Sequence, residues 1–175
     1  MSDARIAPLT ADTHTLDQLT ALLVETVAHG GSVSFMHPLP PEQARAFWQG
    51  SLDAARAGGR VLYGAWDGDT LASTVTLLLD VPPNQPHRAE IAKMMTRSAY
   101  RGRGLATALL RAAEAEATRR GRTLLVLDTS VDGGASKLYE GAGYILVGEI
   151  PDYALTPDGR LNGTLIYYKR LPAQT

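Results

Sequence analysis

The chain has 175 residues, of which 45% are hydrophobic and 20% charged, and its formal net charge is −1. These values fit one globular domain over residues 1–175 and exclude a general electrostatic attraction to nucleic acid or anionic membranes. The absence of cysteine excludes disulfides, thiolate metal sites and a cysteinyl acyl-enzyme. Because the start of the chain lacks a signal-peptide pattern and no apolar run is long enough to span a membrane, we expect a cytoplasmic protein.

Two helices are predicted first. Apolar residues recur at helical spacing from Leu16 to Val27, until a Gly-Gly pair ends the pattern. A second helix begins at Pro41, a residue that suits the first turn, and ends before Gly58. The segment 60–80 then reads as two strands joined by a tight turn.

The segment "RAEIAKMMT" (88–96) alternates as a strand does. The alternation puts Glu90, Ala92, Met94 and Thr96 on one face and Ala89, Ile91, Lys93 and Met95 on the other. A helix follows at 104–120, then a strand at 123–128, a short helix at 135–140 and strands at 144–149 and 164–170. Because the helix at 104–120 crosses between two strands, those strands are parallel, whereas the earlier ones are antiparallel. We expect an α/β fold with a mixed, mostly antiparallel central sheet and helices on both faces.

The sequence "RSAYRGRGLATALL" places two glycines where that long helix begins. Gly102 and Gly104 free the backbone to curl, so that successive N–H groups and the positive end of the helix face one point. Such an arrangement binds phosphate, and the arginines beside the glycines add charge. A solvated turn is the alternative. A dinucleotide-binding loop would need glycine where Thr107 stands, and no Gly-Lys-Ser/Thr follows to make a P-loop.

Two motifs in order resemble those of the GCN5-related N-acetyltransferases. "MMTRSAYRGRGLATALL" resembles their acyl-CoA signature, R/Q-x-x-G-x-G/A, at Arg101, Gly104 and Ala106. "DGGASKLYEGAGY" resembles their second motif, except that Asp132 stands where the family usually has Asn. The order of elements agrees with that family over nearly the whole chain. The resemblance implies acetyl-CoA as cosubstrate, held by Met94, Met95, Thr96, Arg101, Gly102, Arg103, Gly104, Leu105, Ala106, Thr107, Asp132 and Ser136.

The resemblance also implies how this cosubstrate is placed. Residues 94–96 would line the acetyl-pantetheine arm, and residues 101–107 would bind the pyrophosphate. The strands that end near Thr96 and Asp128 would splay apart, with the pantetheine in the gap. A bulge on the first strand would aim a backbone N–H at the thioester oxygen.

Amine acetylation needs a base for the amine and an acid for the departing thiolate. With no cysteine, direct transfer is the natural route. Glu90 and Asp128 are candidate bases. The alternatives are a solvated face or an ion pair with the nearby Arg88 for Glu90, and a strand-end cap for Asp128. The resemblance makes Tyr139 the acid, where a core tyrosine is the alternative. His29, His37 and His87 are alternative bases, and because no pair of histidines has metal-ligand spacing we expect no metal.

A closer likeness concerns the amine acceptor. "AEIAKMM", "LLVLDTS" and "PDYALTPDGRLNGTLIYYKRL" resemble the tabtoxin-resistance acetyltransferases, which implies a small amino-acid-like, toxin or antibiotic acceptor. Acetylation of a protein or peptide, and a non-catalytic acyl-CoA-binding regulator, are the alternatives. We expect no nucleic-acid or membrane partner, and either a monomer or a homodimer.

Overall fold

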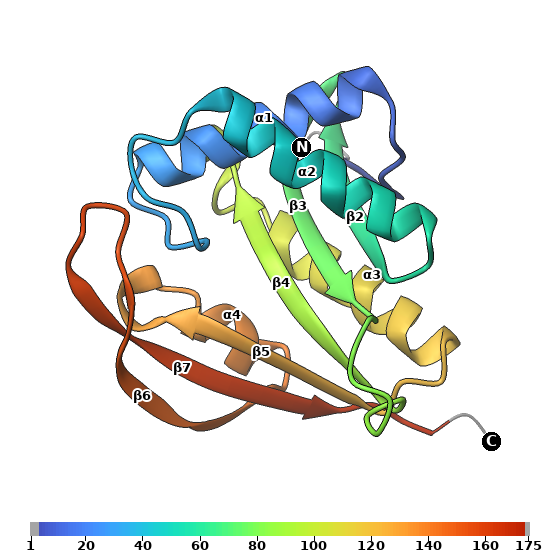
Figure 1. Ribbon diagram of the computed structural model, residues 1–175. Helices are drawn as coiled ribbons and strands as arrows, with labels where there is room; N and C mark the ends of the chain where they lie inside the picture. Colours follow the sequence, from blue (N-terminus) through green and yellow to red (C-terminus); the bar gives the residue numbers. More distant parts are fainter. Residues whose placement is uncertain (1–3, 174–175) are drawn as a thin grey trace.

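A computed structural model describes residues 4–173 as a seven-stranded sheet with helices on both faces (Figure 1). The strands are β1 (Arg5–Pro8), β2 (Arg60–Asp67), β3 (Thr70–Leu78), β4 (Arg88–Thr96), β5 (Leu124–Ser130), β6 (Ile145–Leu155) and β7 (Leu161–Arg170). The α-helices are α1 (Thr13–Ala28), α2 (Pro41–Arg56), α3 (Leu105–Arg119) and α4 (Ser136–Gly141), and short 3₁₀ turns span Ser98–Tyr100 and Val131–Gly133.

The strands lie in the order β1-β2-β3-β4-β5-β7-β6. Only β4 and β5 are parallel, because α3 crosses between them, and every other neighbouring pair is antiparallel. The expected mixed, mostly antiparallel sheet is therefore confirmed. One strand is additional: β1, with four residues, pairs along β2 from Arg5 opposite Trp66 to Pro8 opposite Tyr63.

Helices α1 and α2 cover one face of the sheet. Asp12 caps α1 because its Oδ1 accepts a hydrogen bond from the backbone N–H of Thr15 at 2.8 Å. Proline opens α2, as expected. Between these helices and the sheet lies an apolar cluster that includes the fully buried Leu19 and Trp48. No helix in the described part of the chain is long and apolar enough to cross a membrane.

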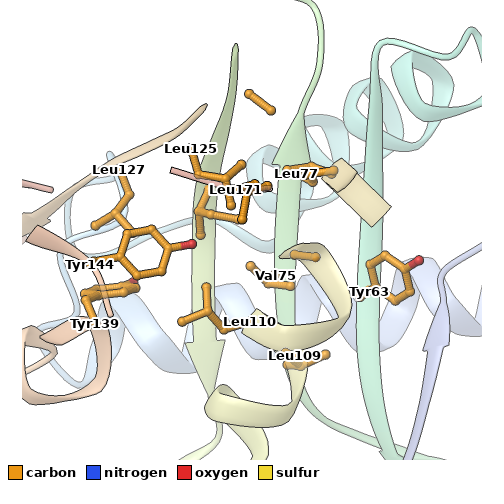
Figure 2. Close-up of a cluster of buried hydrophobic side chains, with 14 of the residues drawn as sticks. Tyr63, Val75, Leu77, Leu109, Leu110, Leu125, Leu127, Tyr139, Tyr144 and Leu171 are labelled. Carbon is orange, nitrogen blue, oxygen red and sulfur yellow. The ribbon is translucent and has the colours of Figure 1, made fainter. Parts of the chain in front are cut away.

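Helix α3 covers the opposite face. Leu109 and Leu110 are fully buried against Val75 of β3 and Leu125 of β5 (Figure 2). Full burial of one such side chain stabilises the fold by about 1.5–3 kcal/mol. This second cluster extends to Tyr139 of α4 at its edge, so the helix that carries the expected acid is fixed by the core.

The sheet separates between β4 and β5. The two strands pair only at Arg88–Leu124, Ala89–Leu125 and Glu90–Val126, and beyond these positions no ladder joins them. Figure 1 shows the pair meeting at one end and diverging toward the other, as the resemblance implied. The halves β1–β4 and β5–β7 are thus joined at one end of a V-shaped opening.

A bulge in β4 changes which side chains share a face. The register with β3 runs from Thr74–Met95 to Thr76–Ala92, so that two residues of β4, Lys93 and Met94, oppose one residue of β3. The expected strict alternation is therefore wrong beyond Ala92. Met94 packs with the α3 cluster, whereas Met95 belongs to the α1/α2 cluster. Glu90 consequently does not share a face with Met94.

Candidate active site

The start of α3 has the backbone that the glycine pattern predicts. Gly102 has φ 74° and Gly104 φ 78°, both in the left-handed region that glycine enters without cost. A Cβ atom at either position would meet no protein atom within 4 Å. The two glycines are therefore required by backbone conformation, and the space in front of them is open.

The amide groups of this helix start lack protein partners. No side chain caps α3, and its first hydrogen bond runs from the N–H of Ala108 to the carbonyl of Gly104, at 3.0 Å. The N–H groups of Leu105, Ala106 and Thr107 therefore have no acceptor among the described residues. With the positive end of the helix dipole behind them, they are suited to a diphosphate, so the residues present fit coenzyme A.

A groove of about 470 Å³ runs past this helix start into the opening between β4 and β5. Of the residues expected to bind the cosubstrate, nine line it: Met94, Met95, Thr96, Arg101, Gly102, Gly104, Leu105, Ala106 and Thr107. Arg103 does not; it lies 4.8 Å from the Tyr100 ring centre and donates a hydrogen bond to the Ala99 carbonyl. Asp132 and Ser136 also lie outside the lining, although residues 133–135 between them belong to it.

A second cavity, of about 380 Å³, lies deeper in the opening. Its lining includes Glu90 and Lys93 from β4, Asp128 from β5 and Ser34 from the loop between α1 and α2. That loop contacts the β6–β7 turn, because the N–H of His37 donates to the carbonyl of Pro157 at 2.9 Å. The loop and the β6–β7 hairpin thus join across one side of the opening (Figure 1).

The groove and the cavity share part of their walls. Ser32, Val33, Met94, Thr129, Ser130 and Tyr139 line both. A ligand that extends along the groove from the helix start therefore reaches the cavity beside Tyr139.

Asp128 lies in the wall of the cavity with its side chain exposed. Its Oδ2 accepts a hydrogen bond from Thr164 Oγ1 of β7, at 2.8 Å. No described cation forms an ion pair with it, because none of the salt bridges of the described residues involves this carboxylate. The carboxylate is therefore oriented from one side within the wall of the cavity.

Glu90 lines the same cavity but has a different environment. Arg88 forms an ion pair with its Oε1, and this is the alternative that the sequence raised. The guanidinium is itself held by Gln85, whose Oε1 accepts from Arg88 Nε at 2.7 Å. The carboxylate of Glu90 is therefore committed to an ion pair, whereas that of Asp128 is not.

Tyr139 is 5% exposed and packs edge-to-face on Tyr144, with ring centres 5.8 Å apart (Figure 2). Burial, and then the negative charge of Asp128, raise the pKa of its phenol to about 12. The phenol therefore stays protonated at neutral pH. It is both a core residue and a residue of the cavity wall, so the two interpretations of the sequence are compatible.

Lys93 is a cavity residue that the sequence analysis did not select. The bulge turns its side chain toward α2, where Nζ lies 3.1 Å from Ser34 Oγ and 5.6 Å from the centre of the Phe47 ring. The only sequence signal was a single cation inside the apolar strand "AEIAKMM". That signal is ambiguous, because alternation gave no indication of a bulge.

The histidines considered as alternative bases lie elsewhere. None of His29, His37 and His87 lines the groove or the cavity, and His29 Nδ1 instead forms a hydrogen bond with Ser98 Oγ at 3.0 Å. In the described part of the chain, no group of three or more histidine, aspartate or glutamate side chains is arranged to hold a metal ion.

Comparisons with known proteins agree with this geometry. The model of the acetyltransferase (GNAT) family matches residues 25–144. The uncharacterized N-acetyltransferase YsnE of Bacillus subtilis (strain 168) is 29% identical over 147 residues, covering 82% of this chain and 92% of YsnE.

Two solved structures illustrate the likeness in fold. YncA of Salmonella typhimurium, solved with acetyl-CoA, has a TM-score of 0.78 at 16% identity, over 97% of this chain and 96% of its own. An aminoglycoside 6′-N-acetyltransferase in complex with coenzyme A has a TM-score of 0.74 at 18% identity, over 98% and 99% of the two chains.

A sheet that opens between two parallel strands, beside a helix start suited to a diphosphate, is the arrangement expected of an acyltransferase that uses a coenzyme A thioester. The chain belongs to the acetyltransferase (GNAT) family, and acetyl-CoA is its cosubstrate. The protein is therefore an N-acetyltransferase that acts on an amine acceptor.

Proposed function

We propose that the chain forms one N-acetyltransferase domain that transfers the acetyl group of acetyl-CoA directly to the primary amine of a small, amino-acid-like molecule. The observation that carries the proposal is that the groove and the cavity meet at Tyr139, with Asp128 in the wall of the same cavity. The two ligands would thus approach one another beside a proton acceptor and a proton donor.

The cosubstrate supplies a thioester, and the chain supplies its binding. The unpaired N–H groups at 105–107 would hold the diphosphate, with Arg101 adding charge from the groove wall. Residues 94–96 would line the pantetheine arm, and a backbone N–H at the β4 bulge would polarise the thioester carbonyl. Arg103, Asp132 and Ser136 lie outside the groove lining, so that their contact with the cosubstrate stays a prediction from the resemblance.

Asp128 would remove the proton from the attacking amine. Of the two candidate carboxylates it is the one without an ion pair, and its hydrogen bond to Thr164 orients it. Glu90, which is bound to Arg88, would shape the cavity rather than carry a proton. The base role therefore falls to Asp128, whereas the sequence alone did not rank the two carboxylates.

Tyr139 would give its proton to the departing sulfur. Its raised pKa, about 12, keeps the phenol protonated at neutral pH, so that a proton is available when the thiolate forms. Its ring packs against Tyr144, so the hydroxyl is positioned by packing.

Two observations favour a small acceptor. The cavity encloses about 380 Å³, and the loop–hairpin contact between His37 and Pro157 joins two walls beside it. The likeness of three segments to tabtoxin-resistance acetyltransferases supports an amino-acid-like amine, including a toxin or antibiotic of that shape. A monomer or a homodimer is compatible with a cavity lined by one chain.

An acceptor screen tests the proposal. Purified protein with acetyl-CoA is offered single amino acids, aminoglycosides and a peptide with a free N-terminus, and release of the coenzyme A thiol is measured. We expect turnover on the amino-acid-like amines. Turnover on the peptide alone would establish a peptide acetyltransferase, and coenzyme A binding without turnover on any amine would establish a non-catalytic regulator.

A matched pair of isosteric variants tests the base. Asp128→Asn should lower kcat by about 10²–10⁴-fold, the range for loss of a general base. Glu90→Gln should change kcat only a few-fold, since its carboxylate is committed to Arg88. A larger loss in Glu90→Gln than in Asp128→Asn would reverse the assignment.

A further inference from the structure

Lys93 presents a cation without a counter-ion in the wall of the acceptor cavity. Its only polar contact is with Ser34 Oγ, and it forms no ion pair with any carboxylate of the described residues. The side chain is half-buried, and burial lowers the pKa of its ammonium, an effect that the charge of Asp128 partly offsets. A desolvated cation is stabilised when an anion is brought to it.

The backbone at this contact is strained on both sides. Lys93 has φ 52° and Ser34 has φ 76°, which place both in the left-handed region that side-chain-bearing residues rarely enter. The described residues contain only one other non-glycine residue with positive φ, Asp152 in β6. Strained conformations persist where the surrounding structure fixes them, and they concentrate at ligand-binding sites. Here the strain holds an ammonium and a hydroxyl side by side.

The anion that fits this position is not part of the cosubstrate. Lys93 and Ser34 line the cavity, but neither lines the groove that leads from the α3 start. Among the cavity carboxylates, Glu90 is already paired with Arg88, and Asp128, whose charge acts on Lys93, forms no ion pair with it. The position therefore remains open to a group that enters with the acceptor.

We propose that Lys93 and the Ser34 hydroxyl bind the carboxylate of the amine acceptor. The inference rests on the proposed function and extends it to a substrate class: zwitterions that carry an amine and a carboxylate, of which α-amino acids are the simplest. Lys93 projects from β4 and Asp128 from β5, so the two charges stand on the two arms of the opening. The acceptor's carboxylate would bind to Lys93 and its amine would face Asp128. This placement orients the amine toward the thioester.

Kinetics on matched acceptors test the inference. Each L-amino acid that the protein acetylates is compared with its own amide, which keeps the amine and the side chain but lacks the carboxylate. In the native protein we expect kcat/KM to be greater for the acid. Lys93→Met keeps the aliphatic stem and removes the charge, and it should raise KM for the acid by about 10–100-fold, the value of a hydrogen bond to a charged group. The amide should be nearly unaffected.

Two further variants separate charge recognition from general damage. Ser34→Ala should raise KM for the acid by a smaller factor, without changing the amide. Lys137→Met removes an exposed lysine of α4 that lines neither the groove nor the cavity, and it should behave as the native protein. An equal loss of kcat/KM on the acid and the amide in Lys93→Met, with kcat reduced, would overturn the inference and indicate a base or a structural lysine.

Calorimetry distinguishes failure of this inference from failure of the proposed function. The protein saturated with coenzyme A is titrated with the amino acid and with its amide, in the native form and as Lys93→Met. Binding of the acid that is lost in Lys93→Met supports the carboxylate site even if no acetylation follows. Turnover on small amines with no preference for the acid over the amide would overturn the site while the proposed function stands. Absence of binding by every acid in the panel would also overturn it.

Discussion

Replacement of Gly104 by alanine tests the backbone that shapes the helix start. At φ 78°, alanine is in the left-handed region, which costs an L-residue about 1–2 kcal/mol. The added Cβ meets no protein atom within 4 Å, so steric overlap adds nothing to that cost. For a chain of this size, the loss corresponds to a fall in melting temperature of about 2–8 °C.

Gly50 provides the matched control. It lies inside α2, and a Cβ there also meets nothing within 4 Å, but its backbone is not left-handed. Gly50→Ala should therefore raise stability by about 0.5–1 kcal/mol, because alanine favours a helix interior. Scanning calorimetry of the two variants without ligand gives shifts of opposite sign. A Gly104→Ala protein as stable as the native one would refute the conformational argument.

The same two variants report on the cosubstrate. Coenzyme A at 100 times its dissociation constant should stabilise the native protein by about 2.7 kcal/mol. If Gly104→Ala weakens binding tenfold, the stabilisation at the same concentration falls to about 1.4 kcal/mol. Gly50→Ala should keep the full ligand-induced shift. An undiminished shift in Gly104→Ala would mean that the diphosphate binds away from the start of α3.

Three further outcomes are expected. Tyr139→Phe keeps the packing but removes the proton, so kcat should fall by about 10²–10⁴-fold in thiol-release assays with little change in KM, and full turnover at every pH would exclude the acid role. The pKa of Tyr139 in the folded protein, about 12, exceeds its ordinary value of 10.0. The stabilisation from keeping the phenol protonated is therefore complete below pH 10. It is lost as the pH rises to 12, because the unfolded chain ionises first. Denaturant titrations of native protein and Tyr139→Phe should therefore show a stability difference that changes by about 2–3 kcal/mol across that window, and a constant difference would contradict the burial argument. Leu110→Ala, at a fully buried position, should cost about 2–5 kcal/mol in the same titrations, whereas Leu161→Ala, 64% exposed, should cost less than about 0.5 kcal/mol.

Local patterns predicted the fold well where side chains alternate between a core and solvent. The start of β4 at Arg88, the glycine-shaped turn before α3 and the proline that opens α2 follow from residues close together in sequence. The parallel pair β4–β5 followed from the crossover helix between them. Strand β1 escaped prediction because four residues, one of them proline, carry too little periodicity.

The parts of the site that depend on non-local geometry were not predictable in this way. The β4 bulge reverses the faces of Lys93 and Met95, and strict alternation gives no indication of an extra residue. The sequence named Asp128, Glu90 and Tyr139 but did not rank the carboxylates, because the ranking depends on where the Arg88 side chain turns. Arg103 faces Tyr100 instead of the groove, which its position in the motif did not reveal.

The three residue pairs that join β4 to β5 have a mechanical consequence. Among the described residues, these three pairs are the only strand pairing between β1–β4 and β5–β7. A ligand that forms hydrogen bonds to both β4 and β5 would hold the two halves of the sheet together. It would therefore slow hydrogen exchange of the amides along both strands. The separation of β4 and β5, rather than any one side chain, would then limit the size of the acceptor that the enzyme admits.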